Sequence, residues 1–100
     1  MHIIAYPKIA SFIQHSPNAE SSLNSWFKLI SKTNYNNFNE LKLTFPSADT
    51  VKDNKGNSLV VFNIHGNNVR LIAAIHYNRN KVYIREILTH AEYDKNKWKE

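Results

Sequence analysis

The 100-residue chain contains no cysteine, only two glycines and no long uninterrupted apolar run. Without cysteine there are no disulfides and no thiolate metal sites. Two isolated glycines exclude a glycine-rich phosphate loop, and the Gly-x-Ser-x-Gly elbow of a serine hydrolase is absent. No stretch is long enough to span a bilayer, and the first residues lack the basic start and apolar segment of a signal peptide. We therefore expect one cytoplasmic domain, residues 1–100, that has no contact with a membrane.

The charge is unbalanced: 13 lysines and arginines face 8 aspartates and glutamates, a net charge of +5. A basic excess favours polyanionic partners, and nucleic acid is the commonest polyanion in a cell. The lysines are spread along the chain, so the charge permits nucleic-acid binding without specifying it. None of the five histidines stands at the spacing of a zinc helix. We expect no metal and no other cofactor.

The rest of the chain is predicted to be organised around the stretch from Leu59 to Asp94. It holds three apolar, β-branched runs separated by turn residues, which is typical of consecutive antiparallel strands. A two-residue loop at Gly66-Asn67 would place Asn63 opposite Arg70. Because successive residues of a strand alternate between faces, one face of the first two strands should be apolar. Its members are Val60, Phe62, Ile64, Val69, Leu71, Ala73 and Ile75.

The other face of this sheet is predicted to carry the chemistry. On the first two strands it receives Asn63, His65, Arg70 and His76. For the third strand, the pattern predicts an apolar side made of Val82, Ile84 and Leu88. The same alternation sends three further side chains to the face of Arg70, namely Tyr83, Arg85 and Ile87. Two arginines, histidines, a tyrosine and an asparagine thus share one surface.

Helices are predicted on both sides of the strand region. Pro7 suits the first turn of a helix that carries Ile9, Phe12 and Ile13. A second helix has an apolar stripe made of Leu23, Trp26, Phe27 and Ile30. Thr89 and Glu92 form a capping-box pattern, so a short last helix should begin at His90 and place His90 and Tyr93 on one face.

A short strand, residues 2–5, should join the same sheet, and residues 45–49 are expected to be extended and then turn. The predicted class is α+β: a small antiparallel sheet, two N-terminal helices packed on one face and a short C-terminal helix. The predicted order is a strand, two helices, three strands and the final helix.

The polar face has the groups that metal-free RNA cleavage requires. Arginine can clamp a phosphate, histidine transfers protons near neutral pH, and tyrosine can stack on a base or donate its hydroxyl proton. A base would take the proton of a ribose 2′-hydroxyl, and an acid would protonate the leaving 5′-oxygen. A structural interpretation stands beside this one: Arg70 and Arg85 only cover the sheet and meet carboxylates, and His90 only opens a helix.

Several segments resemble the HigB family of bacterial toxins, which is similar to the RelE superfamily. They are residues 61–71, Val82-Tyr-Ile-Arg85, the sequence Thr-His-Ala-Glu-Tyr-Asp at 89–94, and the shorter matches at 45–49 and 97–100. The resemblance implies a small antiparallel sheet with two helices near the N-terminus. It also implies an mRNA interferase, a metal-independent endoribonuclease that cuts messenger RNA in the A site of the 70S ribosome. A HigA-type helix-turn-helix antitoxin is the implied partner.

The resemblance also implies roles for individual residues. Arg70 would bind the phosphate, His90 and Tyr93 would transfer protons or stack on a base, and Arg85 would be a second cation. Asn63 and Asn67 stand where the family pattern has asparagine. Together with His65, Tyr83 and Lys95 they are the predicted RNA-binding residues.

The general base stays open. The RelE branch has lysines on the first central strand, where this chain has Val61 and Asn63. His65, His90 and Tyr93 are the alternatives for that role.

Two other functions remain open at this point. The same superfamily includes ParE-like proteins that poison DNA gyrase and cut no RNA. A non-catalytic RNA-binding module would bind with a steep salt dependence and produce no new RNA ends.

Overall fold

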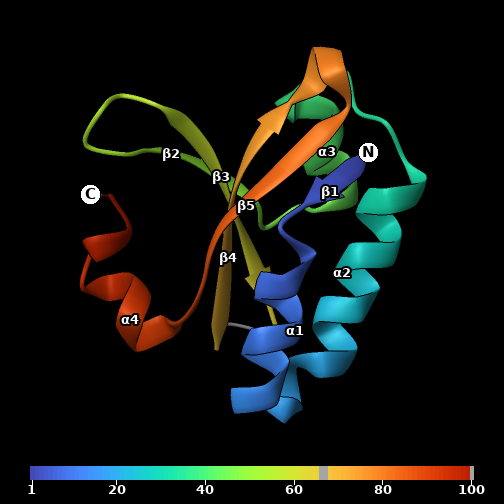
Figure 1. Ribbon diagram of the computed structural model, residues 1–100. Coiled ribbons are helices and arrows are strands. Elements are labelled where there is room, and N and C mark those ends of the chain that lie inside the picture. Colours follow the sequence, from blue (N-terminus) through green and yellow to red (C-terminus); the bar gives the residue numbers. More distant parts are fainter. Residues whose placement is uncertain (66–67, 100) are drawn as a thin grey trace.

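A computed structural model of the protein describes residues 1–65 and 68–99, and it confirms the predicted α+β class (Figure 1). Over these residues the strands form one sheet in the order β1-β5-β4-β3-β2. The elements in chain order are β1 (His2–Ile4), α1 (Tyr6–His15), α2 (Glu20–Lys32), α3 (Phe38–Thr44), β2 (Asp49–Lys52), β3 (Ser58–Ile64), β4 (Val69–His76), β5 (Lys81–Thr89) and α4 (His90–Asp94). Short 3-10 turns are η1 (Pro17–Ala19), η2 (Tyr77–Arg79) and η3 (Lys97–Lys99).

The strand β2 was not predicted. It pairs antiparallel with β3, from Asp49 opposite Val61 to Lys52 opposite Ser58. Three of its four side chains are exposed and only Val51 is partly buried. Such a short edge strand lacks the apolar alternation by which strands are detected. The first strand joins as expected, but β1 runs parallel to β5, so the sheet is mixed.

The predicted register of β3 and β4 is confirmed. Phe62 lies opposite Leu71 and Asn63 opposite Arg70. The turn residues Gly66 and Asn67 lie outside the described residues. The predicted apolar face is the main core: its β3 and β4 members are buried together, and Ile75 packs against them. In Figure 1, α1 and α2 lie on one side of the sheet and α4 on the other.

The assignment of faces at the end of β5 was wrong, because β5 contains a bulge. Ile84 pairs with Ala73 and Glu86 with Ile72, so Arg85 is an extra residue. An extra residue reverses which later side chains face the core. Ile87 therefore packs against the main core, whereas Leu88 packs on the opposite face. The reversal also moves Glu86 from the core face to the opposite face, and its side chain is exposed there.

The face that carries Arg70 is not wholly polar. It has a second, small core made of Leu59, Val61, Ile72 and Trp98. Trp98 in η3 is only 8% exposed, so this residue anchors the C-terminal segment to the body. The apolar centre of this face therefore serves as a bed for the tail, and polar side chains gather towards the ends of β4.

The helices form for the local reasons that the sequence suggests. Proline stands in the first turn of α1, and α2 buries Leu23, Trp26 and Ile30. The α4 capping box is present with both of its hydrogen bonds, between Thr89 and Glu92. Among the described residues, no helix is long and apolar enough to cross a membrane.

A buried carboxylate organises the loop between β2 and β3. The Asp53 side chain is 2% exposed and accepts hydrogen bonds from the backbone of Lys55 and from the backbone and side chain of Asn57, all at 2.9–3.0 Å. Arg85 Nη2 lies 3.5 Å from Asp53 Oδ2. These hydrogen bonds, with a smaller contribution from Arg85, lower the pKa of Asp53 below its usual 3.8. The next residue donates its N–H to the Lys99 carbonyl, so this loop also holds the C-terminal turn.

We expect Leu71→Ala to lower the free energy of unfolding by about 2–5 kcal/mol, because Leu71 is fully buried between the sheet and its helices. Leu43→Ala is the matched control, since Leu43 is 84% exposed. The control should change stability by less than about 0.5 kcal/mol. Urea unfolding followed by circular dichroism measures both, and equal effects would contradict the assignment of the core.

Asp53→Asn tests the buried carboxylate. Because the folded state lowers its pKa, the ionised side chain stabilises the fold above about pH 4, and this contribution disappears as the pH falls below 3.8. The wild type should therefore exceed the variant most at neutral pH, and the difference should shrink on acidification. Urea midpoints at pH 7 and pH 3 give the comparison, with exposed Asp49→Asn as the control. A difference that is constant with pH would disprove this role.

Candidate functional site

The structure brings Arg70, His90 and Tyr93 together at one end of β4. Arg70 Nη2 lies 3.4 Å from His90 Nδ1. The guanidinium carbon of Arg70 lies 5.7 Å from the centre of the Tyr93 ring, within the range of a cation–π interaction. A cation, an imidazole and a phenol thus share one small surface, and the sequence had predicted all three.

Arg70, His90 and Tyr93 come together because of where β5 ends. Val69 pairs with Thr89 and Arg70 with Leu88, so the chain leaves β5 beside the start of β4. The Thr89 hydroxyl accepts the Glu92 N–H at 3.2 Å, which fixes the first turn of α4 at this point. The His90 N–H then donates to the Asn68 carbonyl at 3.0 Å.

Asp94 belongs to this cluster although the sequence analysis gave it no role. Its Oδ2 lies 3.2 Å from His90 Nε2, one helical turn along α4. Because a guanidinium has no acceptor, the Nδ1 atom that faces Arg70 accepts, which leaves the ring proton on Nε2 facing Asp94. The i,i+4 spacing of His90 and Asp94 was the available signal.

Tyr93 is held from two sides. Its ring stacks on Trp98 with centroids 5.3 Å apart and planes 6° from parallel. The Trp98 Nε1–H donates to the Tyr93 carbonyl at 3.1 Å. Burial raises the pKa of the Tyr93 hydroxyl, Arg70 lowers it, and the nearby carboxylates of Asp49 and Asp94 raise it, with a net increase above 10.0. At neutral pH this hydroxyl therefore keeps its proton.

The other predicted residues are more dispersed. Asn63 is next to Arg70 across the β3–β4 pair. His65 lies exposed in the turn after β3, with a left-handed φ of 52°. Lys95 is exposed at the end of α4. Asn67 lies outside the described residues.

Arg85 and Tyr83 lie away from the Arg70 cluster. Arg85 is the bulge residue of β5 and forms its ion pair with Asp53. Tyr83 contacts His76 ring to ring, with centroids 4.9 Å apart, near the opposite end of β4. The prediction of one continuous polar face therefore resolves into two polar groups separated by the small core under Trp98.

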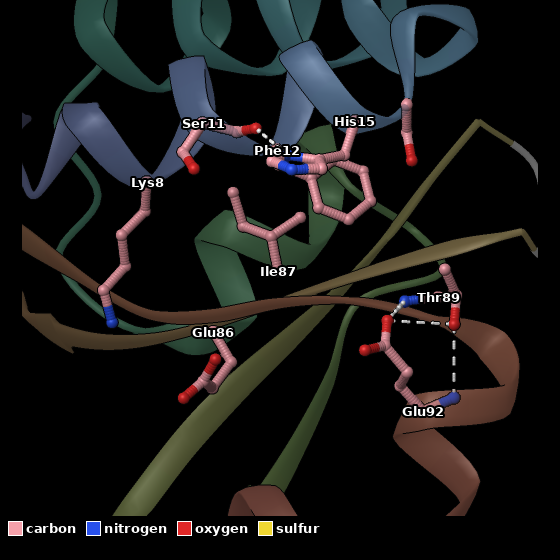
Figure 2. Close-up of a pocket in the computed structure, with 9 residues that line it drawn as sticks. Lys8, Ser11, Phe12, His15, Glu86, Ile87, Thr89 and Glu92 are labelled. Atoms are coloured by element: carbon pink, nitrogen blue, oxygen red, sulfur yellow. Dashed lines mark hydrogen bonds between the residues drawn. The ribbon is translucent and has the colours of Figure 1, made fainter.

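A cleft of about 500 Å³ runs between α1 and β5 and contains none of the predicted site residues (Figure 2). Phe12 and Ile87 contribute apolar atoms to it, and Lys8 and Glu86 lie at one end. It touches the site only indirectly, through the Thr89–Glu92 capping box. Within residues 1–65 and 68–99, no three histidine or carboxylate side chains gather closely enough to hold a metal ion.

The sequence matches the model of the HigB_toxin family, described as a RelE-like toxic component of a toxin-antitoxin system, over residues 19–96. It is 33% identical over 95 residues to the mRNA interferase HigB of Escherichia coli O6:H1, covering 95% of this chain and 90% of that protein. It is also 33% identical over 94 residues to the mRNA interferase toxin HigB of Escherichia coli strain K12, covering 94% and 88% of the two chains. A protein of Shigella flexneri named mRNA interferase HigB matches to the same extent. The chain therefore belongs to the HigB family of RelE-like toxins.

Proposed function

We propose that this protein is a HigB-type mRNA interferase, a metal-independent endoribonuclease that cleaves messenger RNA during translation. The observation that carries the proposal is the contact of Arg70 with both His90 and Tyr93. The names of the relatives, which cover nearly the whole chain, support the same function. Family membership implies an antitoxin partner.

Arg70 is proposed to bind the scissile phosphate. Its guanidinium can place two N–H donors on two phosphate oxygens and stabilise the charge that develops on the pentavalent phosphorus. Asn63, opposite Arg70 on β3, supplies an amide beside it. His65, in the turn after β3, and Asn67 are proposed to contact the flanking nucleotides.

His90 is proposed as the general base. His90 Nδ1 lies beside Arg70 Nη2, and a phosphate bound to Arg70 would replace Nδ1 as the acceptor of that N–H. The released Nδ1 can then accept the proton of the neighbouring ribose 2′-hydroxyl, whose oxygen attacks the phosphorus. Asp94 orients the ring through Nε2 and stabilises the imidazolium that forms. This assignment selects one of the three alternatives that the sequence left open.

Tyr93 is proposed as the general acid. The Tyr93 hydroxyl is protonated at neutral pH and can donate its proton to the leaving 5′-oxygen, and the charge of Arg70 beside the ring opposes the rise in its pKa. The stack on Trp98 fixes the plane of the ring and so the position of the hydroxyl. The reaction is balanced. The 2′-oxygen forms a bond to phosphorus and loses its proton to His90, and the bond from phosphorus to the 5′-oxygen breaks as that oxygen takes a proton from Tyr93.

The proposed substrate is presented by the A site of the 70S ribosome. The Arg70 cluster is small and solvent-exposed, so precise placement of the RNA has to come from a larger assembly. Lys95, Tyr83 and the exposed part of Arg85 are proposed to contact RNA around the cleaved segment. The protein would then act in the cytoplasm, and its antitoxin would be of the HigA type with a helix-turn-helix.

His90→Ala and Arg70→Ala should each abolish new mRNA 5′ ends in a translating extract. Arg70→Ala removes the charge that stabilises the phosphate, and His90→Ala removes the base; a loss of about 100-fold or more is expected for either. His15→Ala, on exposed α1, is the matched histidine control and should cleave like the wild type.

Mapping of 5′ ends with and without active ribosomes provides the measurement. If both variants still produce new 5′ ends, the interferase function stands and the proposed site is refuted. Absence of new ends with the wild type would refute the function, and a DNA gyrase assay would then test the ParE-like alternative.

Trp98→Leu should slow cleavage because it removes the stack that holds Tyr93, whereas Trp98→Phe should restore most of the rate by keeping a flat ring. Single-turnover cleavage on ribosomes, measured alongside ribosome affinity, separates positioning from binding. We expect the rate to fall while affinity changes little. Equal rates for the Leu and Phe variants would show that Trp98 only anchors the tail.

A further inference from the structure

A second group of basic side chains lies at the opposite end of the sheet. His2 on β1 pairs with Lys81 on β5, and Lys81 pairs with His76 on β4. Paired residues of neighbouring strands point to the same side, and neighbouring strands are about 5 Å apart. These three residues, the far basic patch, therefore form a row about 10 Å long across three strands.

The far basic patch faces the same side as Arg70. On β4, Ile75 packs against the main core and Ala74 against the small core, so His76 points to the side of Ala74 and Arg70 by alternation. Ile3 and Val82 likewise pack in the main core, which turns His2 and Lys81 to the other side. His76 is six positions along β4 from Arg70, a distance of about 20 Å.

No carboxylate neutralises this patch within the described part of the chain. The ion pairs found there lie elsewhere, at Lys42–Asp49, Arg85–Asp53 and His90–Asp94. His2 and His76 are exposed and Lys81 is partly exposed. The rings of Tyr83 and His76 meet in a T-shaped contact, and these rings add a surface on which a base can stack.

We propose that His2, His76 and Lys81 bind the phosphate backbone of an RNA segment other than the one being cleaved. The proposal rests on the interferase function. A distance of about 20 Å along β4, with Trp98 seated between the two groups, keeps the far phosphate away from the Arg70 cluster. One lysine and two imidazole rings beside an aromatic side chain supply the hydrogen-bond donors and the stacking surface of an RNA-backbone site. The RNA comes either from the ribosome or from a distant part of the messenger.

The test compares His76→Gln/Lys81→Gln with a matched control, His15→Gln/Lys28→Gln. Both variants lose one histidine and one lysine, but the control residues are exposed on α1 and α2, on the other side of the sheet. Binding of the purified proteins is measured over a range of salt concentrations. The two probes are a 20-nucleotide single-stranded RNA and 70S ribosomes free of messenger.

The far-patch variant should bind more weakly than the control, with a salt slope smaller by about 0.7 for each phosphate that its side chains no longer neutralise. A weaker affinity for empty ribosomes alone assigns the patch to ribosomal RNA, and a weaker affinity for the oligonucleotide assigns it to messenger. Binding equal to the control with both probes would overturn the proposal. So would a defect confined to antitoxin binding, which would mark the patch as a site for an acidic protein.

Cleavage in a translating extract separates this proposal from the function on which it rests. If the wild type cleaves messenger RNA and the far-patch variant binds RNA as tightly as the control, the patch proposal is refuted and the interferase function stands. Loss of RNA binding by the variant, with no cleavage even by the wild type, would refute the interferase and support the patch as an RNA site.

Discussion

The structure depends on the point at which β5 stops pairing with β4. Val69 opposite Thr89 is the last pair of that ladder, and the Asn68 carbonyl accepts the first N–H of α4. The capping box then starts the helix at His90 and not a residue earlier or later. A shift by one residue would rotate α4 by about 100° and carry the imidazole away from Arg70. A cap on the surface thus determines the geometry of the proposed chemistry.

The bulge at Arg85 solves a packing problem that a regular strand could not. β5 must place Ile84 in the main core and Leu88 under the C-terminal tail, on opposite faces, although the two are four residues apart. One extra residue reverses the alternation and achieves this. The guanidinium of the bulge residue then reaches the buried Asp53, whose loop holds the Lys99 carbonyl through the next N–H.

The sequence was sufficient wherever local signals agreed. The loop expected at Gly66-Asn67 and the apolar alternation predicted the β3–β4 register, and the capping box predicted α4 with His90 and Tyr93 on one face. From those features the sequence predicted the residues of the proposed site. The bulge was not predictable, because β5 places apolar residues on both faces whether or not it contains an extra residue. The bulge leaves Arg85 unpaired with β4, and the register of β4 and β5 places Tyr83 opposite Ala74, four residues from Arg70. Trp98 covers the face between the two groups, which is a tertiary feature.

The distribution of charge fits a protein that must leave its RNA after cutting it. The carboxylates that form ion pairs hold the loop at Asp53, orient His90 and fasten α3 near β2. Two small polar groups with basic side chains then lie on the face opposite α1 and α2, and Trp98 packs between them. Two separated contacts bind weakly on their own, and they act together only on a surface that presents RNA at both places. On the proposed function, dependence on a large RNA assembly would follow from how this small sheet is covered.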